Sequence, residues 1–306
     1  MADRRGPRAV IEHRVERTPL GVRIVQRFDA PGVRDLTQVT TLGNASADLV
    51  LESRWCMTDE RDAEATYLVF PFAVTDPQVR YDVGGHAVRP EVDQLPGACR
   101  DYFSVQRWVD VEGGGGGIGI ACPDTPLWQF SDFSFAANRR RFVLEHPWLM
   151  AWVTNNYWHT NFRASQPGPV RARFVLRPYA GSFDESAAHR LGGEVAMPVV
   201  FHHLGEPPVQ GAELPASGSF LQMPQPPIQV LSVRPDLLDG SVLIRVLNAS
   251  NASAEARLAP SLLAIQRAAS ADGLGTVHEV LPVQGDGSVA LRIGARRLAT
   301  LRLWLR

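Results

Sequence analysis

The sequence predicts an all-β protein in two parts, and three observations lead to this prediction. Short runs rich in β-branched and aromatic residues recur at intervals of about ten residues, with turn residues between them. Helical periodicity is nearly absent, whereas a parallel α/β fold would need long helices between its strands. A proline-rich stretch late in the chain is followed by fresh strand-like runs. These patterns are typical of a large sandwich or barrel joined to a smaller β-sandwich.

The first part, residues 1–205, contains most of the strand-like runs. The run at 171–176 shows a period of two most clearly, because Ala172 and Phe174 fall on one face and arginines on the other. Further strands are expected at residues 9–14, 22–28, 48–55, 67–74 and 102–111. The glycine run at 113–117 lies between strand-like runs and predicts a hairpin tip, since a phosphate-binding loop would need a following helix.

One helix is expected, at residues 184–191. Ser182 and Glu185 have the spacing of a capping box, and Gly192 stands where it would end the helix. The proline-rich residues 206–227 predict a linker. The second part, residues 228–306, is expected to form the small sandwich, with strands at 228–233, 241–247, 254–258, 289–293 and 298–305.

The composition excludes several classes of function. The 306 residues carry 31 basic and 32 acidic side chains, so nucleic acid and anionic membranes are not expected partners. Every basic residue is arginine, which removes mechanisms that need a lysine amine. No apolar run reaches about 18 residues and no signal-peptide core is visible, so we expect a cytoplasmic protein. Three cysteines without a CxxC pair predict neither a disulfide framework nor a zinc knuckle.

An aromatic and amide-rich segment, PWLMAWVTNNYWHTNF at residues 147–162, is the most unusual part of the chain. Aromatic rings can stack on the apolar face of a sugar while amides bond to its hydroxyls. The candidates for such contacts are Asn155, Asn156, Trp158 and Asn161. The alternative is that the tryptophans fill a thick β core and the asparagines satisfy buried backbone groups. Composition favours neither interpretation over the other.

A second dense segment, at residues 76–111, combines acids with arginines. Asp82, Glu91 and Asp93 could supply an acid/base pair for glycoside chemistry, but acids beside arginines are more often ion pairs. His202 and His203 are adjacent, so on a strand they would point to opposite faces and could not easily share a metal. The chain shows no nucleophile elbow and no dinucleotide fingerprint. We therefore assign it no catalytic residue and no metal ligand.

Both segments are similar to the carboxy-terminal half of glycoside hydrolase family 38, the retaining α-mannosidases. The matching pieces lie at residues 67–74, 79–111, 122–130, 147–162 and 297–305, in the same order and spacing as in that family. The resemblance implies a galactose-mutarotase-like supersandwich, entered partway and so incomplete at its start, followed by a small β-sandwich. It also implies a catalytic barrel with an aspartate nucleophile and zinc, and the motifs of that barrel are absent from these residues.

The resemblance implies a modest role for this chain in sugar binding. Tyr81 and Asp82, in the RYDVGG turn, are the first candidates for sugar contact. The second are Asn155, Asn156, Trp158 and Asn161, and the third is Arg245. No cofactor is expected in this chain, because zinc would reside on the catalytic barrel. The expected partners are that barrel, as a domain or a subunit, and a mannose-containing glycan.

Two other functions stay open at this point. A free-standing carbohydrate-binding module of lectin type would rest on the aromatic and amide cluster alone. A sugar epimerase on a mutarotase-like fold would need a histidine and a glutamate around the ring oxygen, and His159 with Glu145 is the available pair. The coding sequence directly upstream would separate these from a mannosidase region.

Overall fold

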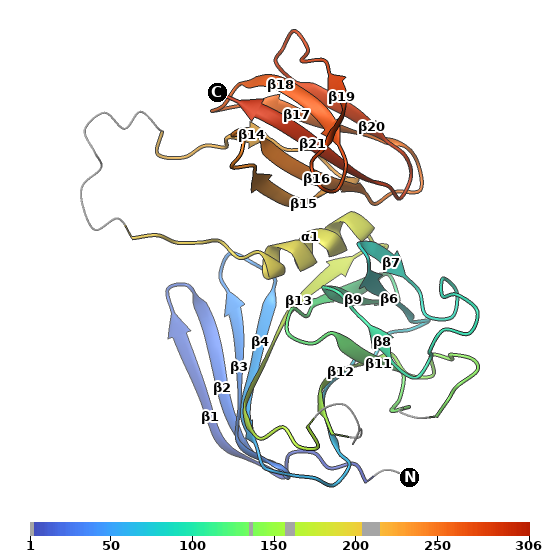
Figure 1. Ribbon diagram of the computed structural model, residues 1–306. Coiled ribbons are helices and arrows are strands. Elements are labelled where there is room, and N and C mark those ends of the chain that lie inside the picture. Colours follow the sequence, from blue (N-terminus) through green and yellow to red (C-terminus); the bar gives the residue numbers. More distant parts are fainter. Residues whose placement is uncertain (1–2, 135–136, 157–162, 204–214) are drawn as a thin grey trace. The chain divides into compact units, whose positions relative to one another are not determined.

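The computed structural model describes residues 3–134, 137–156, 163–203 and 215–306. These residues form twenty-one strands and one helix, which confirms the predicted all-β class (Figure 1). The chain divides into two compact units, Met1–Pro198 and Val199–Arg306. The boundaries predicted at residues 205 and 227 stay predictions. Within the described residues, no helix has the length and hydropathy needed to cross a bilayer.

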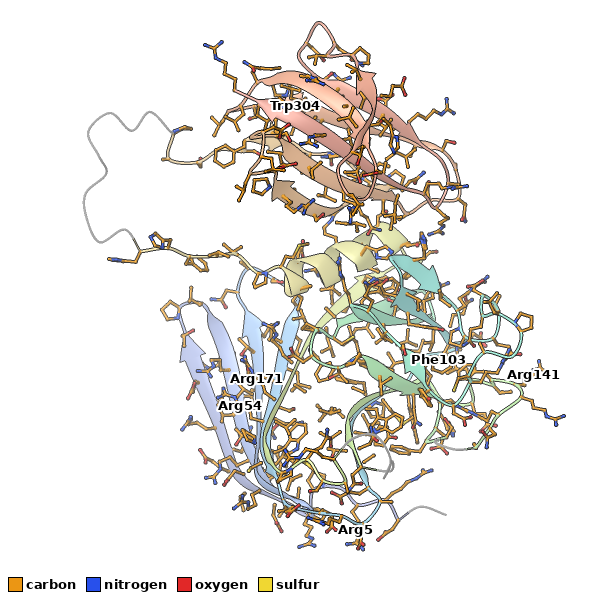
Figure 2. All side chains as sticks on the ribbon, in the orientation of Figure 1. Arg5, Arg54, Phe103, Arg141, Arg171 and Trp304 are labelled. Carbon is orange, nitrogen blue, oxygen red and sulfur yellow. The ribbon has the colours of Figure 1, made fainter. Side chains whose placement is uncertain are left out.

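The first unit is built on a nine-stranded antiparallel sheet. The face of its middle strands that points away from the core carries ion pairs, such as Arg54 Nε to Glu52 Oε1 at 2.6 Å, with Arg171 also bound to Glu52 (Figure 2). In spatial order the strands are β1 (Ala9–Thr18), β2 (Gly21–Asp29), β3 (Val33–Gly43), β4 (Leu49–Met57), β13 (Gly168–Ala180), β10 (Gly116–Ala121), β9 (Trp108–Gly113), β6 (Gln78–Val83) and β7 (His86–Val88).

A four-stranded sheet packs against the inner face of this sheet. Its strands, in order, are β5 (Ala65–Pro71), β12 (Trp148–Asn155), β11 (Leu127–Phe130) and β8 (Phe103–Ser104). Trp128, Phe130 and Phe174 are fully buried in the core that the two sheets share. The rings of Phe103 and Phe130 are stacked with centroids 4.8 Å apart. Aromatic residues thus form a large part of the core between the sheets.

The glycine run forms the predicted hairpin tip between β9 and β10. Gly114 and Gly115 both have positive φ, at 62° and 89°, as a two-residue turn of this type requires. At Gly117 a Cβ atom would lie 2.3 Å from the Tyr179 hydroxyl on β13. The run therefore serves both the turn and the close packing of the adjacent strand.

The single helix, α1 (Glu185–Ala196), begins near its predicted start and ends later than predicted. Its N-cap is Asp184, whose carboxylate accepts hydrogen bonds from the backbone N–H groups of Ser186 and Ala187. The capping role expected of Ser182 was therefore wrong. The expected stop at Gly192 was also wrong, because the helix continues through that residue.

Close packing against β9 explains the glycine at position 192. A Cβ atom there would lie 2.9 Å from Cδ1 of Trp108, whose side chain is fully buried and cannot move away easily. At Gly193 the nearest atom to a Cβ is the flexible end of Met197, at 3.9 Å. Gly192 is thus required by contact with the sheet, whereas Gly193 is not.

We predict opposite effects of the same substitution at these two glycines. Gly193→Ala should stabilise the protein by up to about 1 kcal/mol, since alanine favours a helix interior over glycine. Gly192→Ala should destabilise it by about 1–3 kcal/mol, because overpacking against Trp108 outweighs the helix propensity. Urea unfolding of both variants measures the difference. Two stabilised variants would show that Gly192 is not in contact with the sheet.

The second unit is a sandwich of two antiparallel sheets. The three-stranded sheet consists, in order, of β14 (Leu221–Gln222), β17 (Ala254–Pro260) and β20 (Val289–Ile293). The five-stranded sheet consists, in order, of β15 (Ile228–Pro235), β16 (Val242–Asn248), β21 (Leu298–Leu305), β18 (Ile265–Ala271) and β19 (Val277–Leu281). Ile244, Leu258 and Leu301 are fully buried between the sheets. Leu221, within the proline-rich segment expected to be a linker, also contributes to this core.

Candidate functional site

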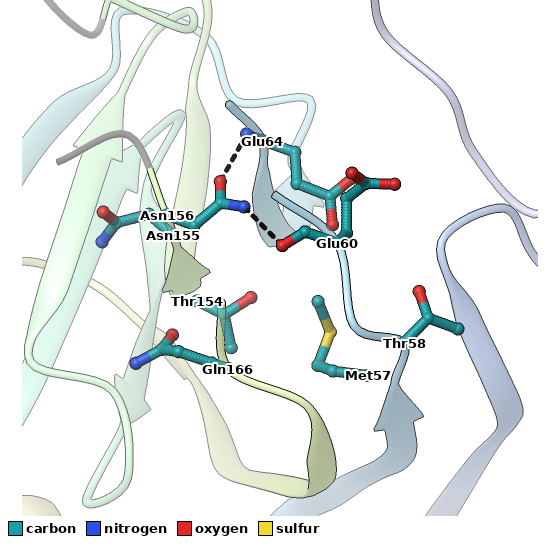
Figure 3. Close-up of a pocket in the computed structure, with 8 residues that line it drawn as sticks. All are labelled: Met57, Thr58, Glu60, Glu64, Thr154, Asn155, Asn156 and Gln166. Atoms are coloured by element: carbon teal, nitrogen blue, oxygen red, sulfur yellow. Dashed lines mark hydrogen bonds between the residues drawn. The ribbon is translucent and has the colours of Figure 1, made fainter. Parts of the chain in front are cut away.

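A polar cluster lies where β4 and β12 end, close to the amide-rich segment singled out in the sequence. Figure 3 shows the side chains that surround a small cavity there. The cavity has a volume of about 10 Å³, room for a single water molecule. Its lining residues are Met57, Thr58, Glu60, Glu64, Thr154, Asn155, Asn156 and Gln166. The described residues of this cluster do not, by themselves, enclose a space the size of a sugar.

Asn156 holds the loop that leads from β4 into β5. Its side-chain oxygen accepts a hydrogen bond from the Glu64 N–H at 2.6 Å. Its amide nitrogen donates to the carbonyl oxygens of Glu60, at 3.0 Å, and Asp62, at 2.9 Å. The residue is buried, so each of its polar atoms needs such a partner. Asn156 therefore acts as a structural clamp on residues 60–64.

Asn155, one position earlier, lies in a different environment. Its side-chain oxygen is buried and has no hydrogen-bond partner among the described residues. A bulge between Trp152 and Thr154 changes the register of β12 against β5 just before it. An acceptor left in this state can receive a hydrogen bond from water or from the hydroxyl of a ligand.

Glu64 gives the cluster a titratable group. Burial raises the pKa of its carboxyl, and the negative charges of Glu60 and Asp62 raise that pKa further. A proton is therefore held to a higher pH than on an exposed glutamate. Together with the Asn155 oxygen, the cluster presents a carboxyl and an amide acceptor to a neutral polar group.

Tyr81 and Asp82 lie in β6, in the interior of the first unit. The Tyr81 ring packs on Phe103, with centroids 5.3 Å apart, and burial raises the pKa of its hydroxyl to about 12. Asp82 is 1% exposed and accepts a hydrogen bond from the Gly85 N–H at 3.1 Å. In the part of the chain that the structure describes, neither side chain lines the cavity beside Asn155. Their contact with sugar stays a prediction.

Asp82 belongs to a buried polar group under α1 that the sequence did not indicate. Burial raises the pKa of its carboxyl, against the opposing fields of His189 and Arg107. His189 Nδ1 accepts a hydrogen bond from the Trp108 indole at 3.2 Å, and its Nε2 lies 3.5 Å from Glu185 Oε1. The spacing of Glu185 and His189 by four residues was the one available signal, because it places both on one face of a helix.

Two of the three acids considered for catalysis, Glu91 and Asp93, are engaged in ion pairs. Glu91 accepts from Arg100 Nε at 2.5 Å and from the Phe142 N–H at 2.9 Å. Asp93 accepts from Arg89 Nε at 3.0 Å. These contacts agree with the interpretation that acids beside arginines form structural ion pairs. The Phe142 N–H, and after it the Arg100 guanidinium, lower the pKa of the Glu91 carboxyl. The Arg89 guanidinium lowers the pKa of the Asp93 carboxyl.

Three of the remaining candidates cannot be placed, and the fourth belongs to the other unit. Trp158 and Asn161, and His159 of the epimerase hypothesis, lie outside the described residues. Arg245 lies in the second unit, on β16, where its guanidinium donates to the Gly273 carbonyl at 2.5 Å.

We predict that the two adjacent asparagines differ sharply in their effect on stability. Asn156→Ala should cost on the order of 2 kcal/mol, because three backbone groups of residues 60–64 lose their buried partner. Asn155→Ala should change stability by less than about 0.5 kcal/mol, since its side-chain oxygen accepts no hydrogen bond from the described residues. Chemical denaturation of both variants provides the comparison. Equal losses would contradict the clamp assigned to Asn156.

Comparisons with known proteins identify the fold and not the sequence family. No protein-family model and no curated protein matches the chain. An α-mannosidase structure from Enterococcus faecalis V583 aligns with a TM-score of 0.69 at 12% identity, covering 97% of this chain and 35% of that chain. A family 38 glycosyl hydrolase structure from Enterococcus faecalis gives 0.64 at 13% identity, covering 97% and 37%. This chain thus has the fold of about a third of those proteins.

Proposed function

We propose that this chain is the carboxy-terminal β region of a retaining α-mannosidase of glycoside hydrolase family 38. In this proposal it shapes the mannoside-binding cleft and has no hydrolytic activity alone. The observation that carries the proposal is the coverage: 97% of this chain aligns with an α-mannosidase structure, and the alignment covers only 35% of that larger chain. The sequence motifs at residues 79–111 and 147–162, which follow the order seen in that family, support the same assignment.

The ion pairs and the burial of the candidate acids support the proposal that this region supplies no nucleophile. A retaining glycosidase needs two carboxyl groups about 5–5.5 Å apart, one of them free to attack the anomeric carbon. Glu91 and Asp93 are each held by an arginine, and Asp82 is buried beneath α1. We therefore assign the nucleophile and the general acid to a catalytic barrel, in the same polypeptide or in a partner subunit.

The zinc ion implied by the family does not fit the residues described here. Among residues 3–134, 137–156, 163–203 and 215–306, no three His, Cys, Asp or Glu side chains gather where they could hold a metal ion. A zinc site that grips a sugar needs several such ligands around one point. We accordingly place zinc on the catalytic barrel and derive no step through it in this chain.

A mannose-containing glycan is the ligand we assign to the assembled cleft. The Asn155 oxygen and the Glu64 carboxyl offer hydrogen-bonding groups at the ends of β12 and at the start of β5. Because their cavity holds about one water molecule, the cleft itself requires further walls from the barrel.

The test is to assay the 306-residue protein alone and after coexpression with the polypeptide encoded directly upstream. We expect the isolated protein to hydrolyse no aryl α-mannoside and to contain no stoichiometric zinc. Turnover and zinc should both appear in the coexpressed complex. Glu64→Gln and Glu60→Gln are informative variants of the isolated chain, because both side chains line the cavity and burial raises the pKa of the Glu64 carboxyl.

Two outcomes would contradict the proposal. One is a tightly held zinc ion in the isolated protein. The other is hydrolysis by the isolated protein that Glu64→Gln abolishes and Glu60→Gln leaves intact, which would place an acid catalyst in this chain.

A further inference from the structure

A hollow on the second unit is much larger than the cavity beside Asn155. Its volume is about 340 Å³, within the range of small-molecule sites. It lies on the five-stranded sheet, on the face opposite the core: Leu243 and Arg245 line it, whereas Ile244 between them points into the core. The full lining is Ser232, Arg234, Leu243, Arg245, Gly273, Leu274 and Thr300.

Strand register brings the polar side chains of this hollow together. Ser232 on β15, Arg245 on β16 and Thr300 on β21 are successive cross-strand partners, so their side chains form one row. Arg234 lies two residues from Ser232 and opposite Leu243, in the next row on the same face. Two guanidinium groups and two hydroxyls are therefore carried by neighbouring strands of a rigid sheet.

The hollow carries positive charge that no carboxylate of the described residues neutralises. The Arg245 guanidinium donates to the Gly273 carbonyl, and the Arg234 side chain makes no ion pair or hydrogen bond with any described residue. No acidic residue is among those that line the hollow.

Three carboxylates that are close to the lining residues in sequence bond to other groups. Asp236 and Asp239 both pair with Arg302, at 2.7 and 3.0 Å. Asp272 accepts hydrogen bonds from backbone N–H groups of its own loop, including that of Leu274 at 2.8 Å. These acids therefore leave the two arginines of the hollow unpaired.

We propose that this hollow binds a sugar-sized molecule that carries an oxyanion, either a phosphate ester or a carboxylate. Guanidinium groups bind such oxygens with strong, charge-assisted hydrogen bonds, and the Ser232 and Thr300 hydroxyls can add further donors. Leu243 and Leu274 offer apolar surface to the carbon skeleton of the ligand. This site is separate from the cluster at Asn155 and does not depend on the proposed mannosidase function.

A small ligand fits these observations better than a nucleic acid. The unpaired charge in the hollow amounts to two arginines within a concave site, and the whole chain has a formal net charge of -1. Binding to a nucleic acid backbone draws instead on an extended stripe of basic residues.

Calorimetric titration of the full 306-residue protein tests the proposal. The probes are glucose 6-phosphate, glucuronate and neutral glucose, and the first two distinguish a phosphate ester from a carboxylate. We expect at least one anionic sugar to bind and glucose not to bind.

Arg245→Gln should weaken the binding by about tenfold or more, the equivalent of one charge-assisted contact. Arg234→Gln should weaken the binding without affecting the fold, because the Arg234 side chain has no hydrogen bond or ion pair with the described residues.

Arg292→Gln is the matched control, since Arg292 is an exposed arginine of the same unit on the other sheet. It should leave the affinity unchanged. The proposal is wrong if neither anionic sugar binds at millimolar concentrations, or if glucose binds as tightly as they do. It is also wrong if Arg292→Gln weakens binding as much as Arg245→Gln. Tighter binding of a short DNA oligonucleotide, weakened equally by all three substitutions, would point to a diffuse polyanion surface and overturn it as well.

Discussion

The packing of the four-stranded sheet against the nine-stranded sheet is the contact on which the first unit depends. Trp128 and Phe130 project from β11 into the space between the sheets, where Phe174 of β13 and Phe70 of β5 meet them. The Phe70 and Phe174 ring centroids are 5.1 Å apart. Burial of several large rings contributes more than any polar contact in the unit. The loops between the sheets take their positions from this core.

The polar cluster at Asn156 is a consequence of that packing. Where β4 and β12 leave the core, the backbone of residues 60–64 needs hydrogen-bond partners, and Asn156 supplies them. Asn155 and Glu64 are then left beside a cavity the size of one water molecule. The amide-rich sequence that is typical of sugar recognition thus has at least one member with a structural task.

The sequence was sufficient to predict features governed by local rules. Alternation at residues 171–176 correctly placed Phe174 in the core, and the glycines at 114 and 115 form the turn they predicted. Strand β3 (Val33–Gly43) was missed because threonine and glutamine interrupt its alternation, and β-strand pairing with both neighbours decides its conformation. Gly192 was wrongly predicted to end the helix, because the need for glycine there comes from close packing against Trp108, which is distant in sequence. The candidate site was harder to predict, since an asparagine that clamps a loop and one that could bind a ligand look alike in sequence.

The central claim is that about a third of a larger glycosidase fold closes a core of its own, and hydrogen exchange measures this directly. We expect the backbone N–H groups of β10, β11, β12 and β13 in the isolated 306-residue protein to exchange slowest and together, because they surround the shared aromatic core. Those of the edge strand β1, where Ile11 is 63% exposed, should exchange much faster. Exchange of β11 and β12 at the rate of an unfolded chain would contradict the account, since it would mean that this core does not form without another polypeptide.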